Sequence, residues 1–367
     1  MKIRHIHAGE VAVPLKTPFK TAVRTVTHVL SLVLKIETDD SRIGHGEAPS
    51  TAVITGDLTG TMRAGLAVLA PQLAGQDLAD FNACLRIVEK GLMHHTSLKA
   101  ALEMALFDLR AQSYGMPLYK LLGGGTPKLK TDVTISVNDA ATMVADCRTA
   151  VDDGFDALKV KVGGRSWRED VETTIAIRKA IGPDVAIRLD ANQGWTPKHA
   201  LRVLAALEQA GVEIELVEQP VKADDIAGLR YITERTTVPI MADEAVFGAT
   251  DAIHLLSTGS ADILNIKLMK TGGISQAIEI AQLARRFRRT CMIGCMLEGV
   301  ISVTAAAHFA VAHADVVTSV DLDGPQLCVE RVVHGGLSML GPWIELPDAP
   351  GLGIERVDGL TREQQFA

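Results

Sequence analysis

Short apolar stretches alternate with longer amphipathic stretches over most of the chain that follows Lys130. Eight apolar stretches are rich in Val, Ile and Leu and have the length of buried strands. They cover residues 132–136, 157–162, 185–190, 214–218, 240–243, 263–268, 291–296 and 318–321. The segments between them are long enough for helices, so the pattern predicts repeated βα units around a parallel sheet. Eight strands favour a closed barrel over an open doubly wound sheet, because the sequence lacks the GxGxxG turn that usually accompanies the open sheet.

The first 125 residues follow a different pattern. Ile3–Leu15 and Leu30–Ile43 are β-rich and predict a small antiparallel sheet. From about Gly56 to Leu122 the apolar residues recur at helical spacing. The expected inward positions are Leu66, Leu69, Leu73, Leu102, Leu106 and Leu109. This part is predicted to be an α+β domain, and residues 336–346 and beyond are expected to return to it as β structure.

Composition narrows the class of protein. The chain has 367 residues, of which 47% are hydrophobic and 22% charged, as in an ordinary folded protein. Its net charge is −7 and it has no Lys/Arg-rich block, so nucleic acid is not expected as a partner. No segment approaches the roughly 20 apolar residues of a membrane span, and the N-terminus lacks a signal-type apolar run. The five cysteines have no metal-site spacing and are expected to be reduced thiols. A soluble cytoplasmic location is the default expectation.

Ionisable residues end five consecutive apolar stretches. They are Lys161, Asp190, Glu218, Asp243 and Lys267, and neighbours in this series are 24 to 29 residues apart, about one βα unit. The carboxyl ends of barrel strands converge on one mouth, where catalytic groups lie. We therefore expect three carboxylates and two lysines to face one another.

Three carboxylates at close range repel one another unless a cation lies between them. Oxygen-only ligands favour a hard ion, so Asp190, Glu218 and Asp243 predict an Mg²⁺ site. The alternative is that each acid is an ordinary surface or helix-capping residue. Three acids in phase with the βα repeat favour the metal site.

Lysines on opposite sides of such a mouth could transfer a proton. Lys159 and Lys161 point to the same face of their strand, and Lys267 approaches from the other side. A lysine acts as a base near neutral pH when desolvation or nearby cations depress its pKa, and Mg²⁺ and Lys159 would supply positive charge. A divalent metal also stabilises the enediolate that forms when the α-proton of a carboxylate is removed. The alternative is that the lysines only pair with the metal-binding carboxylates.

At this point the residues resemble the muconate-lactonizing subgroup of the enolase superfamily, over essentially the whole chain. The motifs that carry the resemblance are Lys159-Val160-Lys161, Asp190-Ala191-Asn192-Gln193-Gly194-Trp195, Val217-Glu218-Gln219-Pro220, Ala242-Asp243-Glu244 and Asn265-Ile266-Lys267. The resemblance implies that Asp190, Glu218 and Asp243 bind Mg²⁺ and that Lys161 and Lys267 are the acid/base pair. Lys159 would assist near the substrate carboxylate.

The same resemblance implies an α/β fold with three parts. Residues 1–125 would form an α+β capping domain, and residues 126–325 a modified TIM barrel of the (β/α)7β type. Residues 326–367 would return to the capping domain and complete it.

Two further motifs indicate the substrate. Asp321-Leu322-Asp323 is similar to the DxD motif of dipeptide epimerases, where the two acids hold the α-ammonium group of the substrate. Thr17–Thr25 resembles the capping loop of Ala-Glu epimerases, in which the residue matching Arg24 pairs with a glutamate side chain. Thr134 and Cys295 are also expected at the substrate site. The implied reaction is epimerisation of a dipeptide, with L-Ala-D/L-Glu as one candidate, by an enzyme that could be a homo-oligomer.

Other functions remain open at the level of sequence. o-Succinylbenzoate synthase, N-succinylamino acid racemase and muconate cycloisomerase use the same lysines and metal. Asp321 and Asp323 favour a dipeptide, because only a substrate with an ammonium group needs two acids at that position. A catalytically silent relative is disfavoured because all five core ionisable residues are present. Glu298 has no assigned role.

Overall fold

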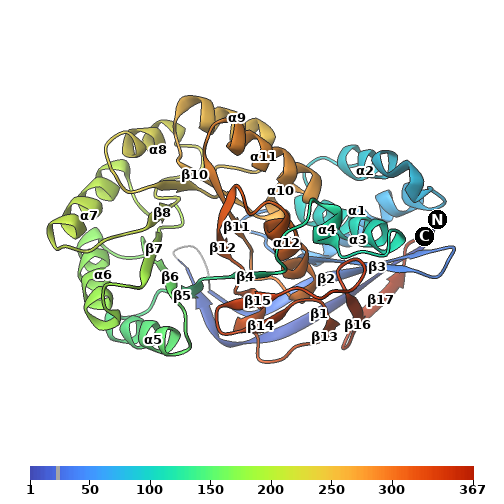
Figure 1. The fold of residues 1–367 in the computed structure, drawn as a ribbon, viewed down its shortest axis with the longest axis horizontal. Coiled ribbons are helices and arrows are strands. Elements are labelled where there is room, and N and C mark those ends of the chain that lie inside the picture. Colours follow the sequence, from blue (N-terminus) through green and yellow to red (C-terminus); the bar gives the residue numbers. More distant parts are fainter. Residues whose placement is uncertain (22–24) are drawn as a thin grey trace.

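The computed structural model describes residues 1–21 and 25–367. Figure 1 shows a barrel with its helices on the outside, and beside it a sheet and helices that contain both ends of the chain. Arg24 lies outside the described residues. Within them, no helix combines the length and the apolar character needed to cross a bilayer.

All eight predicted barrel strands are present, and they form one parallel sheet in chain order. They are β5 (Val133–Ile135), β6 (Ala157–Lys161), β7 (Ala186–Asp190), β8 (Leu216–Glu218), β9 (Ile240–Ala242), β10 (Ile263–Ile266), β11 (Thr290–Gly294) and β12 (Val317–Asp321). The Asp132 amide donates a hydrogen bond to the Val320 carbonyl (3.1 Å), which joins the first strand to the last. The sheet therefore closes into a barrel.

Helices connect the strands and form the outer layer of the barrel (Figure 1). They are α5 (Ala140–Asp152), α6 (Trp167–Ile181), α7 (Pro197–Gln209), α8 (Ile226–Thr233), α9 (Ala249–Thr258), α10 (Leu268–Thr271), α11 (Ile274–Arg286) and α12 (Val300–Ala312). Several begin where the sequence supplies a capping side chain, as Ser166 does for α6. Only the short 3₁₀ helix η2 (Gly324–Leu327) follows β12 directly, so the observed fold is the predicted (β/α)7β barrel.

The N-terminal part packs helices on an antiparallel sheet. The sheet contains β1 (Ile3–Lys20), β2 (Thr25–Thr38) and β3 (Ile43–Pro49), and β17 (Thr361–Gln365) pairs with β1. The helices are α1 (Thr59–Leu73), η1 (Leu78–Asp80), α2 (Phe81–Lys90), α3 (Thr96–Ser113) and α4 (Leu118–Leu121). All six leucines predicted to point inward are fully buried. β3 lies so close to α3 that a Cβ at Gly46 would overlap the carbonyl oxygen of Ala101.

The C-terminal segment forms more short strands than predicted. They are β13 (Val333–Gly335), β14 (Ser338–Leu340), β15 (Trp343–Glu345) and β16 (Ile354–Val357). β15 pairs with β4 (Lys128–Lys130), which directly precedes the first barrel strand in the chain, rather than with the N-terminal sheet. The strand that returns to that sheet is β17, so the return expected of residues 336–346 and beyond is made by the later part of that range. The proposed domain boundaries at residues 125 and 325 stay predictions.

Candidate active site

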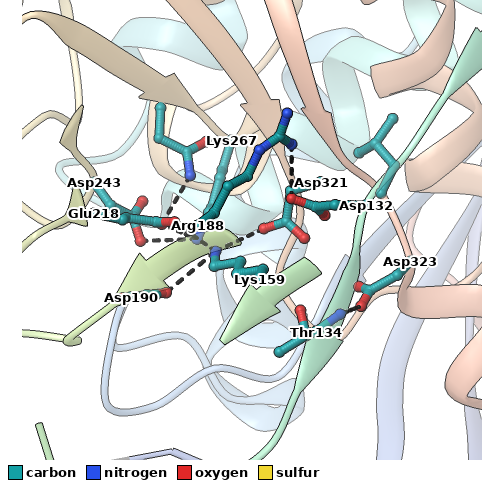
Figure 2. A network of polar contacts seen from close by, with 12 residues as sticks. Asp132, Thr134, Lys159, Arg188, Asp190, Glu218, Asp243, Lys267, Asp321 and Asp323 are labelled. Atoms are coloured by element: carbon teal, nitrogen blue, oxygen red, sulfur yellow. Dashed lines mark hydrogen bonds and ion pairs between the residues drawn. The ribbon is translucent and has the colours of Figure 1, made fainter. Parts of the chain in front are cut away.

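The mouth of the barrel gathers ionisable residues from the carboxyl-terminal parts of its strands, and Figure 2 labels all of them except Lys161. They are Lys159, Lys161, Asp190, Glu218, Asp243, Lys267 and Asp321. None is more than 6% exposed to solvent. Residues from six different strands or strand ends therefore meet in one buried cluster, as the spacing in the sequence predicts.

The ammonium group of Lys159 lies among three carboxylates. Its Nζ is 2.7 Å from Glu218 Oε2, 2.7 Å from Asp321 Oδ2 and 3.2 Å from Asp190 Oδ2. Burial disfavours the charged amine, but the nearby carboxylates, Asp321 first, raise the pKa of Lys159 well above its ordinary value. Lys159 is therefore a fixed positive charge at the mouth.

Lys161 and Lys267 reach the mouth from opposite sides, because β6 and β10 are separated by three strands in an eight-stranded barrel. Lys161 Nζ is 2.5 Å from Asp190 Oδ2, and Lys267 Nζ is 2.8 Å from Asp243 Oδ2. Burial lowers the pKa of Lys267, but Asp243 outweighs burial and raises it above its ordinary value. A proton acceptor must be a neutral amine, so Lys267 needs a further positive charge nearby before it can act as a base.

The acids at the mouth fit a bound Mg²⁺ by their chemistry. Asp190, Glu218 and Asp243 supply oxygen donors, which Mg²⁺ prefers. In the described parts of the chain, no three acidic, histidine or cysteine side chains already surround a common metal position, since lysine ammonium groups lie between the carboxylates. Burial and the charge of Asp190 raise the pKa of Glu218 to about 7. The positive charges around Glu218 therefore do not fully compensate for its burial and for the neighbouring carboxylates.

Two oxygens at the same mouth strengthen this fit. Asn192 Oδ1 and Glu244 Oε2 are buried and accept no hydrogen bond from the described residues. Asn192 also donates two hydrogen bonds, from its backbone N–H to Asp190 Oδ1 (2.8 Å) and from its side-chain Nδ2 to Glu244 Oε1 (3.3 Å). A cation at this position would satisfy buried oxygens that otherwise cost free energy.

Asp321 and Asp323 lie at the end of β12. Asp321 Oδ2 accepts from Lys159, and Asp323 Oδ2 accepts from the Thr134 amide (2.7 Å). Although burial opposes ionisation, Lys159 holds the pKa of Asp321 at about 2, whereas burial and the charge of Asp321 raise the pKa of Asp323 to about 6. A cation bound beside both acids would favour the ionised form of Asp323, so the pair is suited to an ammonium group.

The pocket over these groups has walls from both parts of the chain. The N-terminal part contributes Phe19, Thr21 and Ile54. The barrel contributes, besides the ionisable residues, Thr134, Cys295, Met296 and Leu297. Thr134 and Cys295 thus lie in the pocket, while the predicted contact of Arg24 falls outside the described residues. Burial raises the pKa of the Cys295 thiol well above its ordinary value, which argues against a role as nucleophile.

Lys270 is a residue of this cluster that the sequence interpretation missed. It is fully buried, and its Nζ lies 2.6 Å from Asp243 Oδ1 and 3.0 Å from the Asn265 carbonyl oxygen. Asp243 is therefore held by two lysines, one on each carboxylate oxygen. The available signal was the spacing of three residues between Lys267 and Lys270, which brings side chains together on one helical turn.

The position of Glu298 is also defined. It is 1% exposed, and its Oε1 accepts a hydrogen bond from the Met296 amide (2.7 Å). Met296 lines the pocket, so Glu298 braces the loop that follows β11.

Comparison with known families accounts for both parts of this architecture. Residues 3–123 match the family described as mandelate racemase / muconate lactonizing enzyme, N-terminal domain. Residues 142–358 match the family described as enolase C-terminal domain-like. The chain belongs to the mandelate racemase/muconate lactonizing enzyme family. The resemblance to the enolase superfamily, drawn from the motifs at the strand ends, is thereby confirmed.

Several members of this family that are similar to the chain are named for dipeptides. The L-Ala-D/L-Glu epimerase of Clostridium acetobutylicum is 48% identical over 359 residues, which cover 98% of this chain and 100% of the relative. A substrate-liganded complex of the L-Ala-D/L-Glu epimerase from Bacillus subtilis has a TM-score of 0.95 and 46% identity, covering 98% of this chain and 100% of that one. The dipeptide epimerase from Enterococcus faecalis, complexed with Mg and L-Leu-L-Tyr, has a TM-score of 0.94 and 38% identity, covering 97% and 100%.

Proposed function

We propose that this chain is an Mg²⁺-dependent dipeptide epimerase, which inverts the α-carbon of the C-terminal residue of its substrate. The observation that carries the proposal is the pair Lys161 and Lys267 on opposite sides of one buried mouth, beside the acid pair Asp321 and Asp323. Two bases on opposite faces can remove a proton and return it with inverted configuration. The full-length similarity to dipeptide epimerases supports the same reading.

Each residue has a role that follows from its contacts. Asp190, Glu218 and Asp243 would hold Mg²⁺, which when bound supplies positive charge to stabilise the extra negative charge on the substrate carboxylate. One lysine of the pair, as a neutral amine, takes the α-proton, and the other, as an ammonium, donates a proton to the opposite face. Lys159 keeps its positive charge beside the carboxylates throughout.

Asp321 and Asp323 would bind the α-ammonium group of the dipeptide. Asp321 is ionised at neutral pH, and Thr134 orients Asp323 through its backbone amide. L-Ala-D/L-Glu is our first candidate substrate, since it is named for relatives at 48% and 46% identity. The proposed contact of Arg24 with an acidic side chain would favour that substrate.

The test is proton NMR in D₂O with Mg²⁺ and dipeptides that carry acidic, apolar or basic C-terminal residues. We expect the α-proton signal of the C-terminal residue to disappear, and Lys161→Ala or Lys267→Ala to slow this exchange by at least about a thousandfold, the scale of losing a general base together with its charge. Adding Mg²⁺ should raise the melting temperature of the wild type but not of Glu218→Gln.

The matched control substrate is the same dipeptide with an acetylated amino group. It keeps both side chains and the carboxylate but has no ammonium, so the proposal expects it to exchange much more slowly. If no dipeptide exchanges and an N-succinylamino acid does, the epimerase proposal is wrong and the racemase alternative replaces it.

We also propose a cytoplasmic location. All five cysteines are free and buried, as is usual for proteins of reducing compartments. The expected homo-oligomer stays a prediction.

A further inference from the structure

Two buried glutamates of the N-terminal part reach across to helices of the barrel. Glu47, on β3, accepts hydrogen bonds from the amides of Gly299 (2.9 Å), Ile301 (3.1 Å) and Ser302 (3.3 Å), at the start of α12. Glu103, on α3, accepts from the Ser275 amide (2.9 Å), at the start of α11. Their exposed fractions are 2% and 5%. Each glutamate therefore meets amides that a helix leaves unpaired at its N-terminus.

These two helices begin differently from α5 to α8. α5, α6, α7 and α8 are each capped by a side chain that directly precedes them, namely Asp139, Ser166, Thr196 and Asp225. In the described chain, α11 and α12 follow glycines, Gly273 and Gly299, and receive no such cap from their own segment. α9 also follows a glycine, Gly248, but there Asp251 in the first turn of the same helix accepts a hydrogen bond from the Gly248 amide.

The glycines leave room for the glutamates. A Cβ at Gly273 would overlap Glu103 Oε2, and a Cβ at Gly299 would overlap Glu47 Oε1. Each glycine thus lacks a side chain that could cap its helix, and a carboxylate of the N-terminal part occupies that space instead. A negative charge at a helix N-terminus is stabilised by the helix dipole, which offsets part of the cost of burying it.

Both contacts are close in the chain to residues of the substrate pocket. Gly299 directly follows the loop that contains Cys295, Met296 and Leu297, and α11 follows the short helix that begins after Lys267. Figure 1 shows α3 and β3 beside α10 and α12, in agreement with the contacts between these elements.

The glutamates also sit on two elements that pack closely together. β3 and α3 are in backbone contact at Gly46, and β3 leads within a few residues to Ile54, which lines the pocket. A displacement of these two elements would move one wall of the pocket relative to the lysines on the barrel.

We propose that Glu47 and Glu103 are positioning residues that hold the N-terminal wall of the substrate pocket in register with the barrel. The proposal rests on the proposed function for the identity of the substrate, but the two contacts themselves do not depend on it. The lysines and the proposed metal ligands belong to the barrel alone, so loss of the glutamates should weaken substrate binding without weakening Mg²⁺ binding.

The test uses the full chain with Glu47→Gln, Glu103→Gln and the double variant. Glutamine keeps the shape but removes the charge and turns one acceptor into a donor that faces the helix amides. We expect each single variant to raise KM for the exchanging dipeptide by roughly tenfold, the size of one hydrogen bond to a charged group. We expect kcat to change less than KM, and the Kd for Mg²⁺ to stay at the wild-type value.

The matched control is Asp108→Asn. Asp108 is a buried carboxylate on the same helix as Glu103 and also accepts from backbone amides, those of His45 and Leu352 (both 2.9 Å), but these lie outside the barrel. It should lower stability and leave KM unchanged. Unchanged KM in the double glutamate variant, or an equal rise in Asp108→Asn, overturns the proposal.

A second measurement separates this proposal from the proposed function. Amide hydrogen exchange of residues 50–57 and 295–298, which contain the pocket residues Ile54, Cys295, Met296 and Leu297 but not the amides bonded to the glutamates, should accelerate in the glutamate variants and not in Asp108→Asn. If no dipeptide is turned over, the proposed function fails while this result still decides the role of the glutamates. Unaltered hydrogen exchange in both segments refutes the proposed role of Glu47 and Glu103.

Discussion

Replacing Lys270 with methionine tests whether a second lysine is needed to neutralise Asp243. Methionine has a similar length, so packing around this fully buried position is kept while the positive charge is lost. The change removes the partner of Asp243 Oδ1 at 2.6 Å and a hydrogen bond to the Asn265 carbonyl oxygen at 3.0 Å.

The expected cost is moderate. Removing one partner of a buried ion pair typically costs about 3–5 kcal/mol. Two features reduce this figure: Lys267 still holds Asp243 Oδ2 at 2.8 Å, and burial lowers the pKa of Lys270, so its charge is itself unfavourable there. We expect the free energy of unfolding to fall by about 2 kcal/mol, roughly thirtyfold in the unfolding equilibrium.

The assay is urea unfolding without Mg²⁺, followed by tryptophan fluorescence, for Lys270→Met with and without Asp243→Asn. If Lys270 acts by neutralising Asp243, its removal should cost less once Asp243 is uncharged, because only its hydrogen bonds to the carbonyl oxygens of Asn265 and Asp243 are then lost. Lys120→Met is the exposed control, because Lys120 also pairs with an aspartate, Asp348 at 3.0 Å, and should show no measurable change. An equal cost of Lys270→Met in both Asp243 backgrounds would refute the reasoning.

Two further predictions concern stability. Burial lowers the pKa of His308 to about 3, below its ordinary 6.5, so the folded state accommodates only the neutral ring. The folded state is therefore fully stable, as far as this group is concerned, above pH 6.5. Its free energy of unfolding falls as the pH falls, by about 2 kcal/mol at pH 5. His308→Asn, which retains an acceptor for the Tyr119 amide, should flatten the dependence of urea midpoint on pH between 7 and 5, and an unchanged slope would contradict the assignment. Gly46→Ala should destabilise by about 3 kcal/mol, because the new Cβ overlaps the Ala101 carbonyl oxygen. Gly60→Ala, in open space on α1, should not destabilise in the same denaturation assay; equal losses in the two variants would rule out close packing as the cause.

The barrel could be predicted from sequence because each strand carries its own signal. Asp190 and Glu218 end both the predicted and the observed strands, and Lys161 ends the observed strand one residue before the predicted end, since the buried apolar run gives way to a polar group at the mouth. The start of a strand is less certain: the stretch 214–218 contains a strand only from Leu216. Polarity marks where a strand leaves the core, whereas hydrogen bonding to neighbours decides where it begins.

Contacts between distant segments could not be predicted in this way. Glu47 and Glu103 look like ordinary helix or strand acids in the sequence, and only the fold brings them to Gly299 and Gly273. The return of the C-terminal segment is predicted for residues 336–346 and beyond, and β17 makes it within that range. The sequence does not single out β17, because several short β-like stretches compete and the choice depends on tertiary packing.

The pairing of β1 with β17 has a consequence for the order of folding. His7 pairs with Gln365, so the two partners are separated in sequence by the whole barrel. Bringing such distant segments together costs chain entropy. Folding of the barrel lowers this cost for the pairing of β1 with β17, because it already holds the two ends of the barrel sequence close together. The outer edge of β1 therefore stays unpaired during synthesis until the barrel is complete, and in that interval it is the part of the nascent chain most open to pairing with another molecule.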